Sequence, residues 1–247
     1  MSLTTLAVIA CVVFLTGISK SGFAGALGVF AVPLLLLVMP AIDAIALMLP
    51  ILIIADIFSL KSYWRQWRSD LVRLLMPGIF IGVIIAQWFI SVISPTALTA
   101  LVASFSLLFA LRSLFFSQAR SALLATDWGA RAMATISGVA STLVHAGGPP
   151  LIIYFSSKQL KPLHYVATAA VLFAFMNAIK LIAFTAQGFL TGDILITALA
   201  FTPIAFMGNW VGVKIQQRFK TQKFLKAMNW LLVMLAITLF IKLFVAS

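Results

Sequence analysis

Apolar residues occupy this chain in long runs rather than in short alternating patterns. A run of about 20 apolar residues matches the hydrocarbon thickness of a lipid bilayer. Six runs have that length: 41–60, 74–93, 96–115, 165–187, 191–213 and 227–246. Each must satisfy its backbone hydrogen bonds internally, so we predict six membrane-spanning helices. The strands of an outer-membrane barrel would alternate apolar and polar residues over about 10 positions, and these runs do not.

Two further apolar regions, 1–39 and 131–157, are interrupted by glycine and proline. The first is broken between Gly17 and Pro33, and the second between Ser137 and Pro150. Glycine allows close backbone approach, and proline suits the first turn of a restarting helix. We expect each region to be a hairpin of two short helices with its tip inside the membrane. The alternative is a set of simple helices that are kinked here, with glycines that serve only tight packing.

Composition supports a membrane protein and excludes several other classes. The chain is 63% hydrophobic and 9% charged, whereas a soluble domain carries about 25% charged residues. Its net charge is +12, but the basic residues lie between apolar runs, which indicates cytoplasmic connections rather than nucleic-acid binding. Cys11 is the single cysteine, which excludes disulfides within the chain and cysteine metal clusters. We expect no cofactor.

The basic residues predict the orientation of the spans. Most of them fall in four stretches: Lys61, Arg65, Arg68 and Arg73; Arg112, Arg120 and Arg131; Lys158 and Lys161; and Lys214, Arg218, Lys220, Lys223 and Lys226. The connections 94–95 and 187–193 hold none. Because Lys and Arg favour cytoplasmic loops, the four stretches are predicted inside, and both termini are predicted outside.

This orientation divides the chain into two halves of opposite topology. We predict an all-α integral membrane protein of about eight transmembrane segments, in which each half begins with a Gly/Pro-broken helical hairpin. The first transmembrane repeat is 1–116, the cytoplasmic linker is 117–130, and the second repeat is 131–247. Inverted repeats with broken helices near the membrane midplane are typical of transporters.

Three ionisable residues at membrane depth indicate where such a protein would bind its substrate. Lys20 lies at the first break, His145 at the second, and Lys180 inside span 165–187, one turn after Asn177. A charge at this depth is costly and is by default a functional candidate. Each residue also has a structural alternative. In these alternatives, Lys180 would extend to the membrane interface and Lys20 would lie in a connection at the inner surface. His145 would be a neutral hydrogen-bonded residue, and Asn177 would bond a neighbouring helix.

A helix that restarts at each break would point free N–H groups and its positive dipole end into the break, which favours an anion. The predicted anion-binding residues supply charge, hydroxyls or backbone N–H groups: Ser19, Lys20, Ser21, Gly22, Gly25, Ser141, Thr142, His145, Gly147, Gly148, Asn177 and Lys180. The residues expected to break the helices are Gly28, Pro33, Pro149 and Pro150. Asp56 is expected to pair with Lys61 or Arg65 near the inner surface, or to serve as a cytoplasmic gate.

At these residues the sequence resembles the sulfite exporter TauE/SafE family, also called the TSUP anion exporters. The first match runs from Gly17 through Lys20 to Pro33. The second contains the run His-Ala-Gly-Gly-Pro-Pro from His145 to Pro150, the most specific part of a resemblance that covers nearly the whole chain. Asn177 and Lys180 resemble an N-x-x-K motif of one subgroup, and Asp56 a recurring family position. The first half departs from the family's triple glycine at residues 26 and 27.

The resemblance implies export of small anions, such as sulfite or organosulfonates, across a bacterial cytoplasmic membrane. The expected partners are the anion, membrane lipid and a coupling proton or sodium ion, and His145 is a candidate to carry a coupled proton. A passive anion channel is the main alternative. A membrane enzyme is a weaker one, because the chain has two histidines, no glutamate and no metal-ligand spacing.

Overall fold

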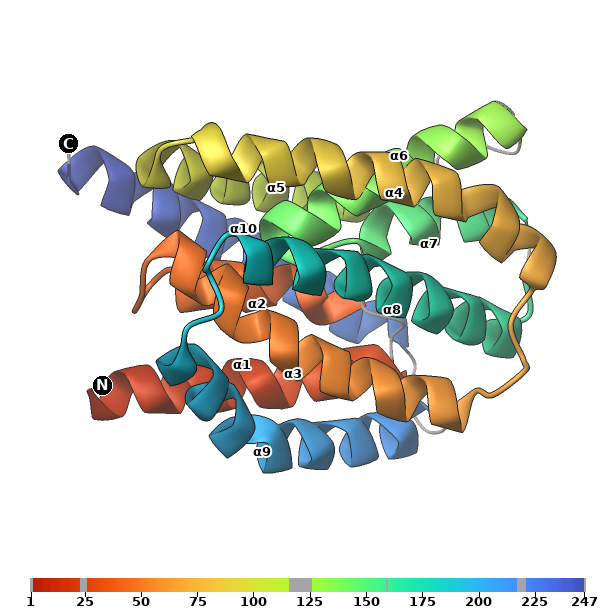
Figure 1. The fold of residues 1–247 in the computed structure, drawn as a ribbon, viewed down its shortest axis with the longest axis horizontal. Coiled ribbons are helices and arrows are strands. Elements are labelled where there is room, and N and C mark those ends of the chain that lie inside the picture. The colour runs from red at the N-terminus through yellow and green to blue at the C-terminus, as the bar shows by residue number, and fades with distance from the viewer. Residues whose placement is uncertain (1, 23–25, 116–125, 159, 217–220, 247) are drawn as a thin grey trace.

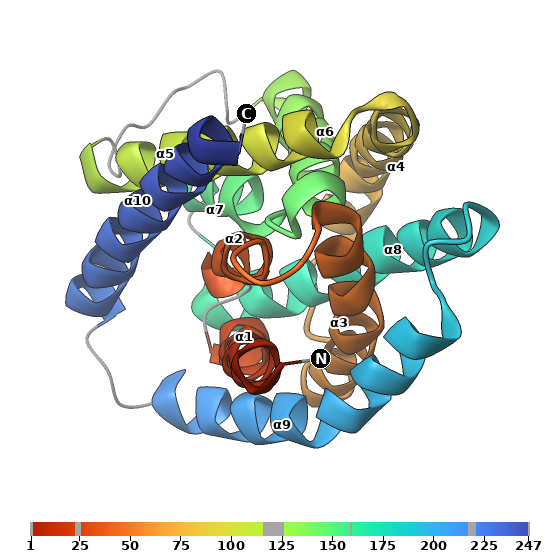
Figure 2. The ribbon, with the colours of Figure 1, turned by 90° about the vertical axis from the view of Figure 1, so that its left-hand side faces the viewer.

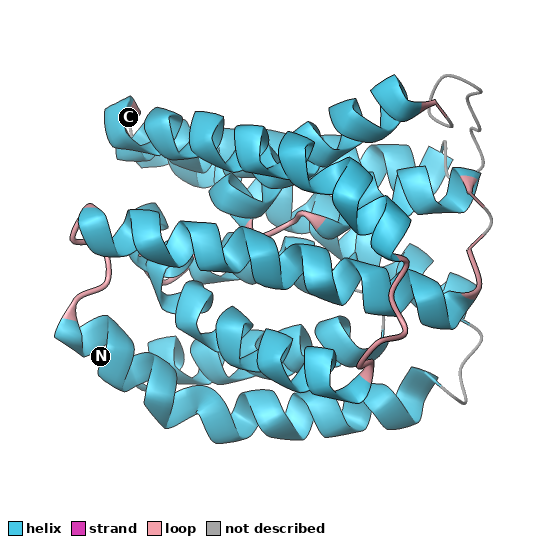
Figure 3. Ribbon diagram, turned by 45° about the vertical axis from the view of Figure 1, so that its right-hand side comes forward, coloured by secondary structure: helices cyan, strands magenta, loops and turns pink. Residues whose placement is uncertain are grey.

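The computed structural model describes residues 2–22, 26–115, 126–158, 160–216 and 221–246. These residues form helices and short connections without a strand (Figure 3). The elements in chain order are α1 (Leu3–Gly22), the 3-10 helix η1 (Ala26–Phe30), α2 (Ala31–Leu35), α3 (Ala41–Ser62), α4 (Ser69–Val92), α5 (Pro95–Phe115), α6 (Asp127–Val144), α7 (Gly148–Ser157), α8 (Pro162–Ala186), α9 (Gly192–Gln216) and α10 (Thr221–Ala246).

Six of the described helices are long and apolar enough to cross a membrane: α1, α3, α4, α5, α8 and α9. Five of them coincide with predicted spans. The sixth predicted span, 227–246, falls in α10, a helix of 26 residues whose apolar stretch within the described side chains is Asn229–Val245. Large apolar side chains such as Ile182 and Phe244 are exposed on the outer surface, as expected for helices that face lipid.

The first broken region is not the predicted hairpin of two short helices, because α1 has 20 residues and is long enough to cross a membrane, whereas η1 and α2 have five residues each. Gly17 and Lys20 were expected within the break, but α1 continues through both residues as far as Gly22. A Cβ atom on Gly17 would lie 2.4 Å from the backbone oxygen of Ala205. Gly17 therefore allows close packing of α1 on α9 and does not end the helix.

The second broken region starts earlier than predicted. Helix α6 begins at Asp127 rather than near residue 131, because the Thr126 side chain caps it by accepting a hydrogen bond of 3.1 Å from the Gly129 N–H. Residues 127–130 of the predicted linker are thus helical, while residues 116–125 lie outside the described part. The interruption itself falls at 145–147, and α7 restarts with Pro149 and Pro150 in its first turn.

Both termini lie at the same end of the bundle (Figures 1 and 2). The connections 36–40, 93–94 and 187–191 also lie at this end, which we call the terminal end (Figure 1). The opposite end carries the connection 63–68, the start of α6, the end of α7 and the start of α8 (Figure 1). We call it the basic end, because Lys61, Arg65 and Arg68 lie there.

The helices of the two halves pair in a matched way. Helix α1 packs on α9, and α6 packs on α4; α3 contacts α9, and α8 contacts α4. Helices α3 and α8 also contact each other, as do α5 and α10. In the α1–α9 and α4–α6 pairs, a glycine lets the two helices approach closely. Gly138 of α6 resembles Gly17 in this respect, because a Cβ atom there would lie 2.5 Å from the oxygen of Ile79 in α4.

Candidate functional site: a cavity between the two helix breaks

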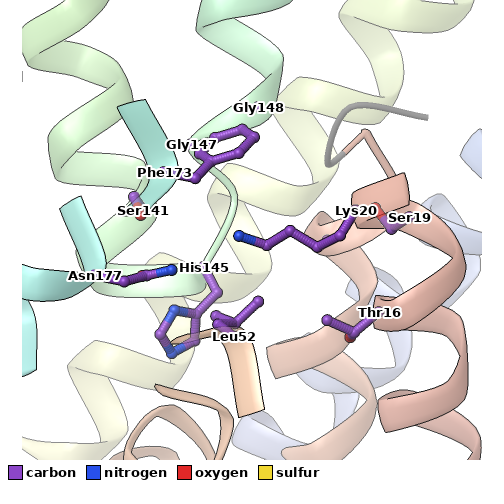
Figure 4. Close-up of a pocket in the computed structure, with 11 residues that line it drawn as sticks. Thr16, Ser19, Lys20, Leu52, Ser141, His145, Gly147, Gly148, Phe173 and Asn177 are labelled. Carbon is purple, nitrogen blue, oxygen red and sulfur yellow. The ribbon is translucent and has the colours of Figure 1, made fainter. Parts of the chain in front are cut away.

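A small cavity lies where the two broken regions meet. Its volume is about 20 Å³, which is room for about one water molecule. The lining residues come from α1, η1, α3, the α6–α7 break and α8: Thr16, Ser19, Lys20, Gly28, Leu52, Ser141, His145, Gly147, Gly148, Phe173 and Asn177. Figure 4 shows the side chains of Lys20, His145 and Asn177 approaching one another from three of these elements.

The two breaks touch directly. A Cβ atom on Gly28 would lie 3.2 Å from the backbone oxygen of His145, so a glycine keeps the 3-10 helix close to the second break. His145 itself ends α6 in the left-handed conformation, with φ of 52°. This backbone angle is unfavourable for a residue with a side chain, and it turns the chain sharply toward Gly147 and Gly148.

Asp56 binds two of the predicted site residues. One carboxylate oxygen forms an ion pair with the Lys20 ammonium, and the other accepts a hydrogen bond of 2.5 Å from the Asn177 side chain. The expected partners Lys61 and Arg65 are therefore wrong. Asp56 is buried in α3, and a buried carboxylate is costly unless a nearby charge and hydrogen bonds compensate it. Lys20 meets that condition, whereas Lys61 is exposed.

The Lys20 ammonium keeps hydrogen-bond donors available at the cavity. Among the described residues, Asp56 is its only acceptor, and an ammonium carries three donors. The Phe173 ring covers part of the group, with its centroid 4.7 Å from Nζ. The chain thus places an ion-paired ammonium against the cavity, and two of its N–H groups have no acceptor among the described residues.

Lys180 has a different environment, although it is also buried. Its Nζ lies 2.9 Å from the Ser141 backbone oxygen, 3.1 Å from the Ser141 hydroxyl and 3.0 Å from Nδ1 of His145. These three acceptors use all three donors of the ammonium. Lys180 is not among the described residues that line the cavity. Lys180 stabilises the second break by its hydrogen bonds to Ser141 and His145, which themselves line the cavity.

The hydrogen bonds around His145 assign a neutral ring. Nδ1 accepts from the Lys180 ammonium, and Nε2 lies 2.8 Å from the Ile45 backbone oxygen. A carbonyl oxygen can only accept, so Nε2 carries the proton and donates. The ring therefore bridges the second break to α3.

The second break presents backbone donors. Neither Gly147 nor Gly148 has an acceptor for its N–H among the hydrogen bonds of the described residues. The Gly147 carbonyl accepts a hydrogen bond of 2.5 Å from Ser137 of α6. Because the C=O and N–H of a trans peptide point in opposite directions, the Gly148 N–H points away from α6. This is the start of α7, where helix N–H groups favour an anion.

Several other predicted residues are not among the described residues that line the cavity. The Ser21 hydroxyl lies 2.8 Å from the Asn209 oxygen and joins α1 to α9. The Thr142 hydroxyl bonds within its own helix, to the Gly138 oxygen at 2.9 Å. Pro33 lies inside α2. Gly22 belongs to α1, and Gly25 lies outside the described residues.

Three cavity residues were not predicted: Thr16, Leu52 and Phe173. Each lies one helical turn before a predicted residue on the same helix, namely Lys20, Asp56 and Asn177 respectively. Residues one turn apart share a helix face, so this spacing was the available signal. None of the three stood out in the sequence, because threonine, leucine and phenylalanine are common in any membrane span.

One protein family has a sequence model that matches this chain. The sequence model of the family described as Sulfite exporter TauE/SafE matches residues 9–239, nearly the whole chain. The chain belongs to the TauE/SafE family. No curated protein and no solved structure matches it.

Membership in the TauE/SafE family makes the protein a multi-pass membrane transporter of the anion exporter class, and not an enzyme. The site is consistent with a binding role. Within the described residues, no three His, Cys or acidic side chains gather in a group able to hold a metal ion. The cavity offers an ammonium, an amide and backbone N–H groups, which are hydrogen-bond donors, and the TauE/SafE family implies transport of an anionic substrate.

Proposed function

We propose that this TauE/SafE protein is a secondary transporter that exports small oxyanions, of the sulfite or organosulfonate class, by alternating access. The observation that carries the proposal is the Lys20 ammonium, which lines a cavity between the two breaks and has two N–H donors that no described residue uses. Charge also favours an anion there. Two buried ammonium groups, Lys20 and Lys180, and one carboxylate, Asp56, leave one uncompensated positive charge, which a singly charged oxyanion neutralises.

The same proposal explains the matched helix pairing. We infer two inverted repeats, 1–116 and 131–247, with the basic end in the cytoplasm and both termini outside. Support comes from residues in equivalent places. Asp56 and Asn177 are 121 residues apart and bond each other where α3 meets α8, and Lys20 and Ser141 have the same spacing. Equivalent positions that meet in this way are expected on the pseudo-two-fold axis of an inverted repeat.

The size of the cavity fits a carrier in a closed state. At about 20 Å³ it holds about one water molecule, which is less than an oxyanion of four or more heavy atoms requires. Substrate entry then requires the two halves to move relative to each other, as in other inverted-repeat carriers. A coupling proton or sodium ion, with His145 as the proton candidate, stays a prediction.

The test is flux in proteoliposomes that contain the purified protein. Labelled sulfite and sulfoacetate are loaded inside, and efflux is followed with and without unlabelled anion outside; taurine, a zwitterion, is the control substrate. We expect saturable efflux that external anion accelerates, and no taurine flux. Absence of flux for every anion tested would contradict the proposal. Efflux that neither saturates nor responds to external anion, together with single-channel currents, would establish the channel alternative.

A further inference from the structure

Two apolar side chains bound the cavity from opposite directions. Leu52 of α3 and Phe173 of α8 both line it, and both are buried, with 5% and 7% of their surface exposed. Each precedes a residue of the central polar pair by one helical turn: Leu52 precedes Asp56, and Phe173 precedes Asn177. The two side chains therefore occupy equivalent positions in the two halves of the chain.

The helix directions place these side chains on different sides of the polar pair. Helix α3 runs from the terminal end to the basic end, and α8 runs from the basic end to the terminal end (Figure 1). Leu52 therefore lies on the terminal side of Asp56, and Phe173 lies on the basic side of Asn177. Figure 4 shows them on opposite sides of the Lys20 ammonium.

From this geometry we propose that Leu52 and Phe173 are the two gates of the cavity. Leu52 closes it toward the terminal end, and Phe173 closes it toward the basic end. The inference rests on the proposed alternating-access transport and identifies the side chains that perform it. An apolar side chain across a narrow polar path excludes water and ions. Movement of either residue away from the polar pair opens the cavity to one side only.

The two gates differ in their response to substrate. The Phe173 ring contacts the Lys20 ammonium through its face, at 4.7 Å from centroid to Nζ, a favourable cation–π arrangement. Leu52 has no π face to offer. An anion that binds Lys20 competes with the ring for the same charge, so binding weakens the contact that holds the Phe173 gate shut. The gate at the basic end is thus coupled to substrate, and the gate at the terminal end is not.

The test measures access to the cavity from each side and requires no substrate. In a Cys11→Ser background, Thr16→Cys places a thiol on the cavity wall. A membrane-impermeant thiol reagent is then applied to one side of oriented membrane vesicles. Arg68→Cys, at the exposed start of α4, marks the basic side. Phe173→Ala and Leu52→Ala are each combined with the reporter. Ile53→Ala and Phe175→Ala are the matched controls, because they truncate nearby side chains of the same helices that are not among the described cavity-lining residues.

We expect Phe173→Ala to speed labelling from the side that labels Arg68→Cys, and Leu52→Ala to speed it from the opposite side. Each rate should rise by about tenfold, because an open state populated at about 0.1–10% can gain that factor. Labelling rates equal to those of the controls, or faster labelling from the opposite side to the one expected, would overturn the assignment of the two gates. If either alanine variant fails to give a monodisperse protein, valine replaces alanine at that position.

A second variant tests the coupling. Phe173→Leu keeps an apolar side chain at the gate but removes the aromatic ring from Lys20. Both gates are then leucines, as Leu52 already is in the first half. Sulfite binding should tighten by about threefold or more, because the anion no longer competes with the cation–π contact. Unchanged or weaker binding would refute the coupling. If labelling changes from the expected sides but no sulfite or sulfonate is transported, only the proposed substrate class is refuted. The gate proposal and the substrate proposal can therefore fail independently.

Discussion

The two buried lysines show how differently the same residue type serves the two halves. Lys20 has one acceptor among the described residues, contacts an aromatic ring and lines the cavity. Lys180 has three acceptors and lies behind the cavity wall. Both were equally good candidates in the sequence. The number of unused N–H donors separates a lysine that can bind a ligand from one that holds the fold together.

The largest effect on stability is expected from a variant that removes the counter-charge of Lys20. Asp56→Ala leaves the Lys20 ammonium buried without its counter-charge, which should lower the free energy of unfolding by about 3–5 kcal/mol. The double variant Lys20→Met, Asp56→Leu should recover most of that loss, because a buried ion pair can be replaced by apolar groups at little cost. Unfolding in detergent measures both. A double variant as unstable as Asp56→Ala would show that the pair has another structural role.

A smaller effect tests whether the halves are equivalent in their packing. Gly17→Ala and Gly138→Ala each place a methyl group within 2.4 and 2.5 Å of a backbone oxygen on the neighbouring helix. Each should cost about 1–3 kcal/mol of unfolding free energy from overpacking. Gly192→Ala, whose added Cβ atom would meet no described atom within 4 Å, is the control. A clear loss for only one of the two glycines would argue that the α1–α9 and α4–α6 contacts are not equivalent.

The smallest effect concerns the support of the second break. Ser137→Ala removes the hydrogen bond to the Gly147 carbonyl and should cost about 1 kcal/mol. Thr99→Ala is the control, because Thr99 is half-buried and its hydroxyl bonds its own helix at the Pro95 oxygen. The midpoint of thermal unfolding compares the two. Equal midpoints would mean that the Gly147 carbonyl finds another donor when Ser137 is lost.

Sequence patterns predicted the long helices well because the bilayer leaves few alternatives. Five predicted spans correspond to helices of the required length and hydropathy, since an apolar run in lipid has to satisfy its own backbone. The extent of α1 was harder to predict. Glycine at position 17 has the same sequence signature whether it ends a helix or allows a neighbour to pack closely, and only the position of α9 distinguishes the two.

The candidate site was predictable in its charged residues but not in their pairing. Lys20, His145, Asn177 and Lys180 stood out because polar groups are rare at membrane depth. The partner of Asp56 was missed, because a nearby residue in the sequence, Lys61, was a simpler choice than Lys20 on another helix. Leu52 and Phe173 have ordinary membrane-span side chains, so their place beside the cavity follows only from the contact of α3 with α8.

The most direct test of the account compares anion binding by Lys20→Gln and Lys180→Gln, with sulfite titrated into each purified protein by calorimetry. A hydrogen bond to a charged group contributes about 1.5–3 kcal/mol, so Lys20→Gln should weaken binding by about tenfold or more. Lys180→Gln should lower the unfolding midpoint and weaken sulfite binding by less than Lys20→Gln does, since Lys180 donates its hydrogen bonds to Ser141 and His145 and acts on the cavity only through its charge. Unchanged affinity in Lys20→Gln, or a larger loss in Lys180→Gln, would contradict the account.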